Sequence, residues 1–244
     1  MLKSIIMSKP DKPLSPRLIT FDFGDTLVTS EPEYLERTAL GLTELGYEKE
    51  VKHVKKAYFE ADLLTASELL PKAPFTTDDF QRTFGRHFFE GLGLHEEYPT
   101  IGPPLRDFLI GFRPQRVMMP GAIELLDKLH DAGYALGIIS NNDGNTREKC
   151  EDVGIDDKFM FILDSTIEGV NKPDPRIFLK ALATANVKSG EVLHVGDLWG
   201  CDVMGAKRAG IPAVWLGNDF VTPELEDETY RIENLLELLE LVES

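Results

Sequence analysis

Short apolar runs alternate with segments of helical length over the second half of the chain, and this alternation constrains the fold most. The runs that predict strands occupy 134–139, 158–164, 191–195 and 213–216. Helical spacing covers 145–152, 175–185 and 203–209, after a helix that Pro120 and Gly121 open and before a leucine-rich helix over 232–242. Alternation of this kind predicts βαβ units and an α/β fold with a parallel sheet.

A strand of the same kind occurs once near the start, over 17–23, but the chain then changes character. Between about 31 and 112 it shows only helical patterns. Helix-breaking residues interrupt them at Pro71, Pro74, Gly91, Gly93, Pro99, Pro103 and Pro104. We therefore expect an all-helical cap over 30–114, inserted into a discontinuous core made of 17–29 and 115–244. An insertion after the carboxyl end of a strand lies over the ligand crevice, where a lid belongs.

The composition argues against several classes of partner. The 244 residues carry a formal net charge of -16, and such a surface repels nucleic acid and anionic membranes. No apolar run approaches the roughly 18 residues of a membrane helix. Two cysteines make no disulfide framework, so we expect a reducing cytoplasm. Residues 1–16 are expected to form a flexible tail, and nothing in the sequence indicates an oligomeric state.

Four separated segments follow or end apolar runs with residues that can handle a phosphate. The candidates are Asp22, Ser140 with Asn141, Lys172, and Asp197 with Asp202. Because the carboxyl ends of parallel strands point into one crevice, we expect these residues to meet there. Each also has an ordinary interpretation: a turn residue, a helix N-cap or an exposed loop lysine. The order of the set and its placement after apolar runs carry the information.

The chemistry of the set suits phosphoryl transfer. A carboxylate such as Asp22 can attack phosphorus and form an aspartyl-phosphate. The hydroxyl and amide at 140–141 can hold phosphate oxygens, and Lys172 can neutralise developing charge. The carboxylates of Asp197 and Asp202 suit Mg²⁺. Three aspartates give -3 and Mg²⁺ with the lysine gives +3, so a phosphate dianion can enter once the cation is bound.

In these segments the chain resembles the haloacid dehalogenase-like hydrolase superfamily, whose members are mostly phosphatases. The matching motifs are Phe21 to Leu27, Ile139 to Asn141, Lys172 to Pro175, and Gly196-Asp197 with Asp202 to Ala206, extended by Ala209-Gly210. The resemblance covers nearly all of 18–216. It implies a Rossmann-like, doubly wound core, a helical cap and Mg²⁺. It also implies that Asp22 is nucleophile and metal ligand. Phosphate would be held by Ser140 and Lys172, and the metal would be supported by Asp197 and Asp202.

The chain departs from the family's pattern beside the nucleophile. Family phosphatases usually carry a second aspartate two residues later, which protonates the leaving group and then activates water. That position is Gly24 here, and Asp25 follows where glycine is common. Gly24 can offer its carbonyl to the metal but supplies no acid, a loss of about 10²–10⁴ in rate.

Several interpretations stay open. In one, Asp25 or a residue of the helical cap takes over in a working phosphatase. In another, the protein is a weak phosphatase or stalls at the phospho-aspartate. In a third, it is an impaired binding or regulatory protein. Haloacid dehalogenases also lack this acid, but they lack the metal carboxylates that this chain keeps. Phosphonate cleavage needs an imine-forming lysine in the cap, where the candidates are Lys49, Lys52, Lys55 and Lys56.

The interpretation we favour is a Mg²⁺-dependent phosphomonoester hydrolase that acts on a small phosphorylated metabolite. His194 lies in a predicted buried strand, so we expect it to be a core residue. The remaining histidines show no ligand spacing.

Overall fold

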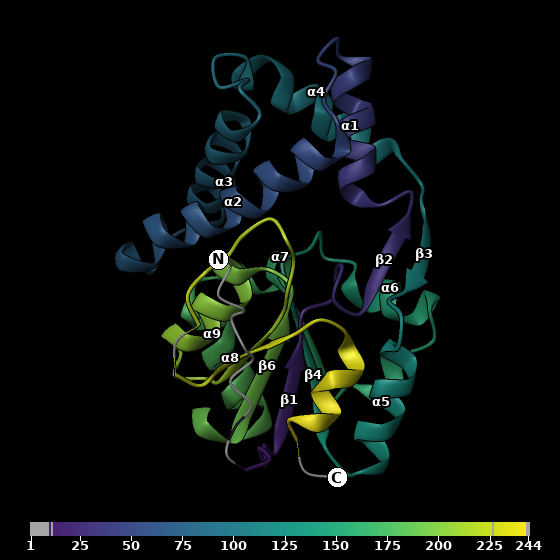
Figure 1. The fold of residues 1–244 in the computed structure, drawn as a ribbon, viewed down its shortest axis with the longest axis vertical. Coiled ribbons are helices and arrows are strands. Elements are labelled where there is room, and N and C mark those ends of the chain that lie inside the picture. Colours follow the sequence, from purple (N-terminus) through teal and green to yellow (C-terminus); the bar gives the residue numbers. More distant parts are fainter. Residues whose placement is uncertain (1–9, 11, 226, 243–244) are drawn as a thin grey trace, which may run out of the picture.

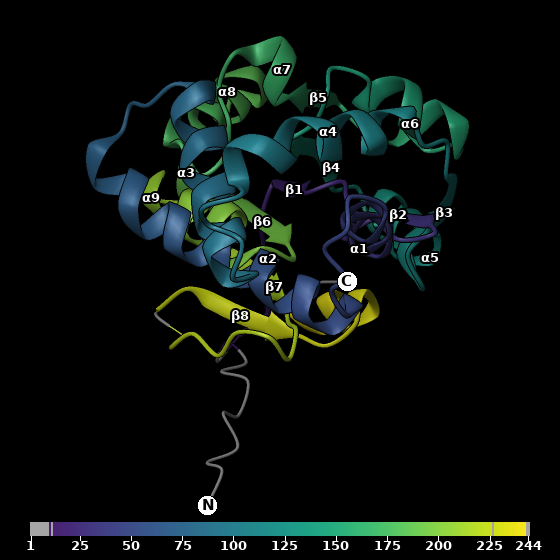
Figure 2. The same ribbon diagram turned by 90° about the horizontal axis from the view of Figure 1, so that it is seen from above.

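The computed structural model describes residues 10, 12–225 and 227–242. Six strands form one parallel sheet in the order β5-β4-β1-β6-β7-β8. Figure 1 labels β4, β1 and β6 of this sheet, and Figure 2 labels all six. They are β1 (Leu18–Phe21), β4 (Ala135–Ser140), β5 (Phe161–Asp164), β6 (Val192–Gly196), β7 (Ala213–Leu216) and β8 (Thr229–Ile232). The strand order reverses at β1, so the predicted doubly wound α/β class is confirmed, and ligands bind at such a reversal.

Alternation along β1 explains why both faces of the sheet are covered. Successive side chains of a strand point to opposite faces. Ile19 and Phe21 pack into one apolar cluster with helix α5 (Ala122–Asp131). Leu18 packs into a second cluster with helix α8 (Pro175–Ala185). All three side chains are fully buried, as expected for a central parallel strand.

Shorter helices complete the core around this sheet. They are α6 (Thr146–Asp152), η2 (Asp156–Lys158), α7 (Ser165–Glu168), η3 (Ser189–Glu191), η4 (Trp199–Met204), α9 (Gly205–Arg208) and η5 (Leu235–Glu240). The element η4 is one turn of π-helix, a geometry that is rare and often found at functional sites.

A helical cap stands above the carboxyl ends of the strands. It comprises α1 (Tyr34–Glu44), α2 (Val51–Leu69), η1 (Leu70–Lys72), α3 (Thr77–Gly91) and α4 (Tyr98–Gly111). These helices share their own apolar cluster, which includes Leu42, Val54 and Leu92. Helix α2 packs on η4 of the core, and Figure 2 shows it crossing over β6 and β7.

Pro103 and Pro104 are expected to interrupt the helical pattern, but helix α4 continues through both of them. Each internal proline costs about 3 kcal/mol of helix stability. Ile101 and Leu105 lie on the same side of this helix and are buried in the cap cluster. Their burial contributes roughly 1.5–3 kcal/mol each. Tertiary packing therefore offsets much of the local preference.

The sequence pattern does not predict three short strands, namely β8 and the antiparallel pair β2 (Val28–Glu31) and β3 (Gln115–Met118). This pair lies at the entry to and exit from the helical cap. The predicted helix over 232–242 is wrong, because its first residue ends β8 and the 3₁₀-helix η5 follows. Leu235 and Leu238 are buried three residues apart, a spacing that aligns side chains on a 3₁₀-helix.

Part of the predicted tail lies outside the described residues, namely 1–9 and 11. Within the remainder, the Leu14 N–H donates a hydrogen bond of 2.7 Å to the carbonyl of Leu241, beside an isolated bridge to Val242. In the part of the chain that the structure describes, no helix is long and apolar enough to cross a membrane.

Candidate active site

Three aspartates converge at the carboxyl ends of β1 and β6. Asp22 directly follows β1, and its N–H donates to the carbonyl of Val195 on β6 at 2.8 Å. Asp197 directly follows β6, and Asp202 lies on η4. Each aspartate offers one carboxylate oxygen, and the three oxygens lie within 4.8 Å of one another. Hard oxygen ligands at this spacing fit a small divalent cation such as Mg²⁺.

A glycine makes room for this arrangement. A Cβ at Gly196 would lie 2.2 Å from the carboxyl carbon of Asp202. Any other residue at this position would therefore collide with the candidate ligand. The glycine that precedes Asp197 is part of the site because of this close approach.

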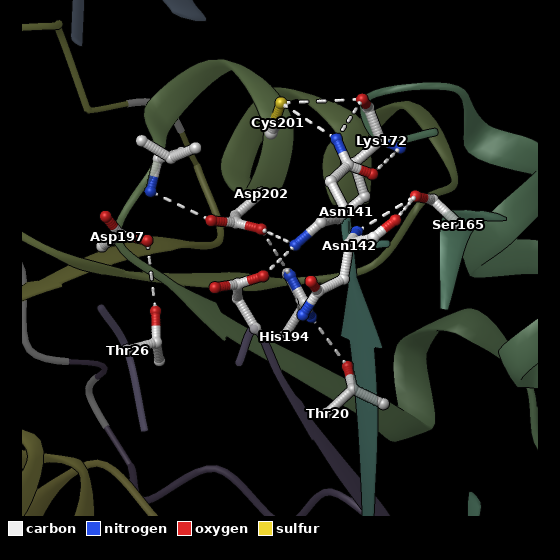
Figure 3. A network of polar contacts seen from close by, with 12 residues as sticks. Thr20, Thr26, Asn141, Asn142, Ser165, Lys172, His194, Asp197, Cys201 and Asp202 are labelled. Atoms are coloured by element: carbon white, nitrogen blue, oxygen red, sulfur yellow. Dashed lines mark hydrogen bonds and ion pairs between the residues drawn. The ribbon is translucent and has the colours of Figure 1, made fainter. Parts of the chain in front are cut away.

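Lys172 lies between two of the aspartates, although it is only 1% exposed. Its Nζ atom lies 2.5 Å from Asp22 Oδ1 and 2.6 Å from Asp202 Oδ1. In Figure 3 Asp202 lies between Asp197 and the Lys172 side chain, which approaches it from the side away from Asp197. The lysine that the sequence places in a loop is thus the buried counter-charge of the carboxylates.

Burial and ion pairing shift the pKa values of these three carboxyl groups in different directions. Burial raises the pKa of Asp22, although the Lys172 ammonium opposes that shift. Burial and the neighbouring Asp22 and Asp202 raise the pKa of Asp197 well above its usual value. Burial acts in the same direction on Asp202, but Lys172 and His194 outweigh it and lower the pKa of that carboxyl. A cation would favour the ionised form of all three.

The predicted phosphate-binding residues lie beside this group, with Ser140 buried at the end of β4. The Asn141 side chain has another task here. Its amide donates to the Lys172 carbonyl at 2.9 Å, and its Oδ1 accepts from the Lys172 N–H at 2.7 Å. Asn141 therefore holds the backbone of the lysine loop. Direct phosphate contacts by 140–141 stay a prediction.

Asp25 lies outside the group of three oxygens. It adopts a left-handed conformation with φ of 56°, at the turn between β1 and β2. Its Oδ1 accepts a hydrogen bond of 2.6 Å from the hydroxyl of Thr29 on β2. Burial raises the pKa of this carboxyl. Its side chain is thus bonded to the strand pair that leads to the helical cap.

Gly24 is exposed, and a Cβ built on it meets nothing within 4 Å. An aspartate would therefore fit at the position where the family's phosphatases usually carry the acid. Coordination of a metal by the Gly24 carbonyl stays a prediction.

Some residues that hold the candidate ligands in place carry no signal in the sequence. His194 is fully buried, as expected, but its Nε2 also lies 3.3 Å from Asp202 Oδ1 and its Nδ1 2.9 Å from the Thr20 hydroxyl. Burial lowers the pKa of His194, so we assign a neutral ring that donates to Asp202 and accepts from Thr20. The Thr26 hydroxyl donates to Asp197 Oδ1 at 3.3 Å.

Comparison with known proteins gives consistent findings. A family model described as haloacid dehalogenase-like hydrolase matches residues 16–210. The glyceraldehyde 3-phosphate phosphatase of Pyrococcus abyssi (strain GE5 / Orsay) is 33% identical over 208 residues, 82% of this chain and 80% of the relative.

Two similar solved structures carry different activities in their descriptions. A HAD phosphatase from Thermococcus onnurineus aligns with a TM-score of 0.56 and 26% identity, covering 92% of this chain and 96% of that one. A 2-haloacid dehalogenase from Pseudomonas syringae pv. Tomato DC3000 aligns with a TM-score of 0.55 and 27% identity, covering 93% and 97%. Overall likeness therefore does not separate the two chemistries, and the side chains of the site must do so.

Proposed function

Because the chain belongs to the haloacid dehalogenase-like hydrolase family, we propose that it is a Mg²⁺-dependent phosphomonoester hydrolase. The observation that carries the proposal is the group of three carboxylate oxygens within 4.8 Å, with an ammonium between two of them. A cation held by three acidic groups together with one lysine brings the pocket to zero net charge, which admits a phosphate dianion.

In this proposal Asp22 is the nucleophile. Its carboxylate attacks phosphorus, the bond to the leaving oxygen breaks, and an aspartyl-phosphate forms that water then hydrolyses. Lys172 lies 2.5 Å from the attacking carboxyl group and stabilises negative charge on the phosphoryl oxygens. Ser140 and the backbone at Asn141 orient those oxygens. Bound Mg²⁺, held by Asp22, Asp197 and Asp202, would supply further positive charge.

Proton transfer is the step that this chain handles differently from the family's usual pattern. Gly24 carries no acid, and the Asp25 carboxyl is bonded to Thr29. We propose that the enzyme favours phosphate esters whose leaving groups need little protonation. Acyl phosphates and activated aryl esters are of that kind.

The substrate is proposed as a small phosphorylated metabolite. The relative from Pyrococcus abyssi is named for glyceraldehyde 3-phosphate, so we include triose phosphates in the first panel of substrates. The helical cap over the strand ends favours compact substrates that can be enclosed.

Two alternatives are less well supported. A dehalogenase needs no metal, whereas Asp197 and Asp202 are kept here and lie with Asp22. A binding or regulatory protein without turnover is favoured by Gly24 alone. Phosphonate cleavage is disfavoured by the pairing of two of its candidate lysines, Lys55 with Glu33 and Lys56 with Glu60.

The test is hydrolysis of p-nitrophenyl phosphate, followed by the substrate panel, with Mg²⁺ and with a chelator. We expect Mg²⁺-dependent turnover that Asp22→Asn removes. Phosphate binding without turnover would favour the regulatory alternative. Chloride release from a 2-chloro acid without Mg²⁺ would favour the dehalogenase.

A further inference from the structure

A carboxylate from the helical cap is buried against the core beside the candidate active site. Asp62 lies on α2 and is only 1% exposed. Its Oδ1 accepts a hydrogen bond of 2.9 Å from the N–H of Cys201, and its Oδ2 accepts one from the N–H of Gly200. A buried carboxylate is costly unless such bonds are made, so this contact depends on close docking of the helical cap.

The two N–H groups belong to the first turn of η4, which has no capping side chain of its own. Its N-cap residue is Leu198, and the structure shows no side-chain hydrogen bond there. The first N–H groups of a helix lack partners within the helix. Asp62 supplies acceptors from 138 residues away. The Leu198 N–H donates instead to Asp202 Oδ2 at 3.0 Å, so both carboxylates stabilise the same turn.

The backbones of α2 and η4 also approach each other closely at this point. A Cβ at Gly200 would lie 2.4 Å from the carbonyl oxygen of Asp62. Only a residue without a side chain lets α2 approach η4 this closely. One helical turn away on α2, the ring of Phe59 stacks on Phe220 of the β7–β8 connection, with 5.4 Å between centroids.

A second contact fastens the helical cap next to the catalytic lysine candidate. The Phe75 N–H donates to Asp174 Oδ2 at 3.2 Å, and Arg176 Nη2 donates to the Phe75 carbonyl at 2.9 Å. Asp174 follows Lys172 by two residues. Each contact therefore includes a core residue within two positions of a charged side chain of the site, Gly200 and Cys201 beside Asp202 and Asp174 beside Lys172.

We propose that Asp62 is a positioning residue that couples docking of the helical cap to the geometry of the Asp202 turn. When α2 is docked, Asp62 holds the start of η4, and Asp202 faces Asp22 and Asp197. When α2 moves away from the core, the N–H groups of Gly200 and Cys201 lose the acceptors that Asp62 supplies. Because coupling is reciprocal, cation binding at the three aspartates favours the docked cap by the same factor. This inference rests on the cation site of the proposed function but requires no particular substrate.

The test uses the full chain with Asp62→Asn, which keeps the size of the side chain but replaces one acceptor oxygen by an NH₂ group. In metal-free protein, amide exchange over 199–204 should quicken by about tenfold or more. Calorimetric titration with Mg²⁺ alone should show an affinity for Mg²⁺ that is at least about fivefold lower than in the wild type. Phe59→Ala should change both quantities in the same direction, because it loosens the docked cap while the hydrogen bonds of Asp62 to η4 stay available.

Asp107→Asn is the matched control. Asp107 is an exposed residue of α4, which packs on α1 and α3 within the helical cap. It should leave Mg²⁺ affinity unchanged. The inference is overturned if Asp62→Asn folds and binds Mg²⁺ as the wild type does, even where phosphatase activity is present. Wild-type protein that binds Mg²⁺ but hydrolyses nothing would overturn the proposed function only.

Discussion

Lys172 Nζ lies 2.5 Å from Asp22 Oδ1, so the ammonium and the candidate nucleophile are partners across 150 residues of sequence. Both groups are buried, and a second carboxylate, Asp202, shares the same ammonium. A buried ion pair of this kind contributes little net stability to the fold, because removing the two charges from water costs about as much as their attraction gains. Its value is the charge that it places where a phosphoryl group must enter.

Lys172→Ala should destabilise the metal-free protein by about 3–5 kcal/mol, because it leaves buried carboxylates without their counter-charge. Added Mg²⁺ should recover part of that loss by supplying positive charge at the same place. Melting curves with a chelator and with Mg²⁺ measure both effects. Lys56→Ala removes an exposed lysine paired with Glu60 and serves as the control, with a change within about 0.5 kcal/mol. An equal loss for Lys172→Ala in both conditions would contradict the account.

Gly24→Asp should raise kcat by at least about tenfold on alkyl phosphates, since a general acid is worth about 10²–10⁴. The gain should be small on p-nitrophenyl phosphate, whose leaving group needs little protonation. Gly24→Asn, of the same size but without an acidic proton, is the matched control. If neither substrate class gains, the wild type already has an acid, and Asp25→Asn would then identify it.

Asn141→Ala should lower kcat by about 10–100-fold, because Lys172 loses the two hydrogen bonds that the Asn141 side chain makes to its backbone. Asn142→Ala is the neighbouring control, since its side chain accepts from Lys149 instead. Steady-state kinetics with saturating Mg²⁺ measure the change. Unaltered kinetics in Asn141→Ala would show that the lysine loop is held by other contacts.

Asp62 gives the stability a defined dependence on pH. Burial raises the pKa of Asp62 from 3.8 to about 6. Between these values the folded protein keeps a proton that the unfolded chain has released, so the free energy of unfolding falls as pH rises. The slope should be about 1 kcal/mol per pH unit at most.

Asp62→Asn should remove that part of the slope. Urea unfolding of both proteins with a chelator, at about pH 4, 5 and 6, measures it as a difference between two curves, because carboxyl groups far from Asp62 contribute equally to both. Parallel curves would show that Asp62 is ionised throughout this range.

The sheet and the strand-end aspartates were predictable because their signals are local. Each apolar run is long enough to identify a buried strand, and the carboxyl ends of parallel strands must share one edge. Strands such as β2, of four residues with partly exposed side chains, carry too weak a pattern to stand out. Helix α4 shows the opposite limit, because packing of Ile101 and Leu105 outweighs what its prolines indicate locally.

Contacts that depend on how the helical cap and the loops pack on the core were not predictable. Nothing near Asp62 in the sequence indicates that it accepts hydrogen bonds from Gly200 and Cys201. His194 reads as an ordinary core residue, since its bond to Asp202 depends on how η4 folds back over β6. The amide of Asn141 reads as a phosphate ligand until the loop of Lys172 is placed beside it.

The central claim is that a cation bound by Asp22, Asp197 and Asp202 turns a group of carboxylates that repels anions into a phosphate site. Calorimetric titration with inorganic phosphate, once with Mg²⁺ present and once with a chelator, tests it most directly. We predict binding with Mg²⁺ and none without it, and loss of the Mg²⁺-dependent binding in Asp197→Asn. Phosphate binding of equal strength in both conditions, or none in either, would contradict the account.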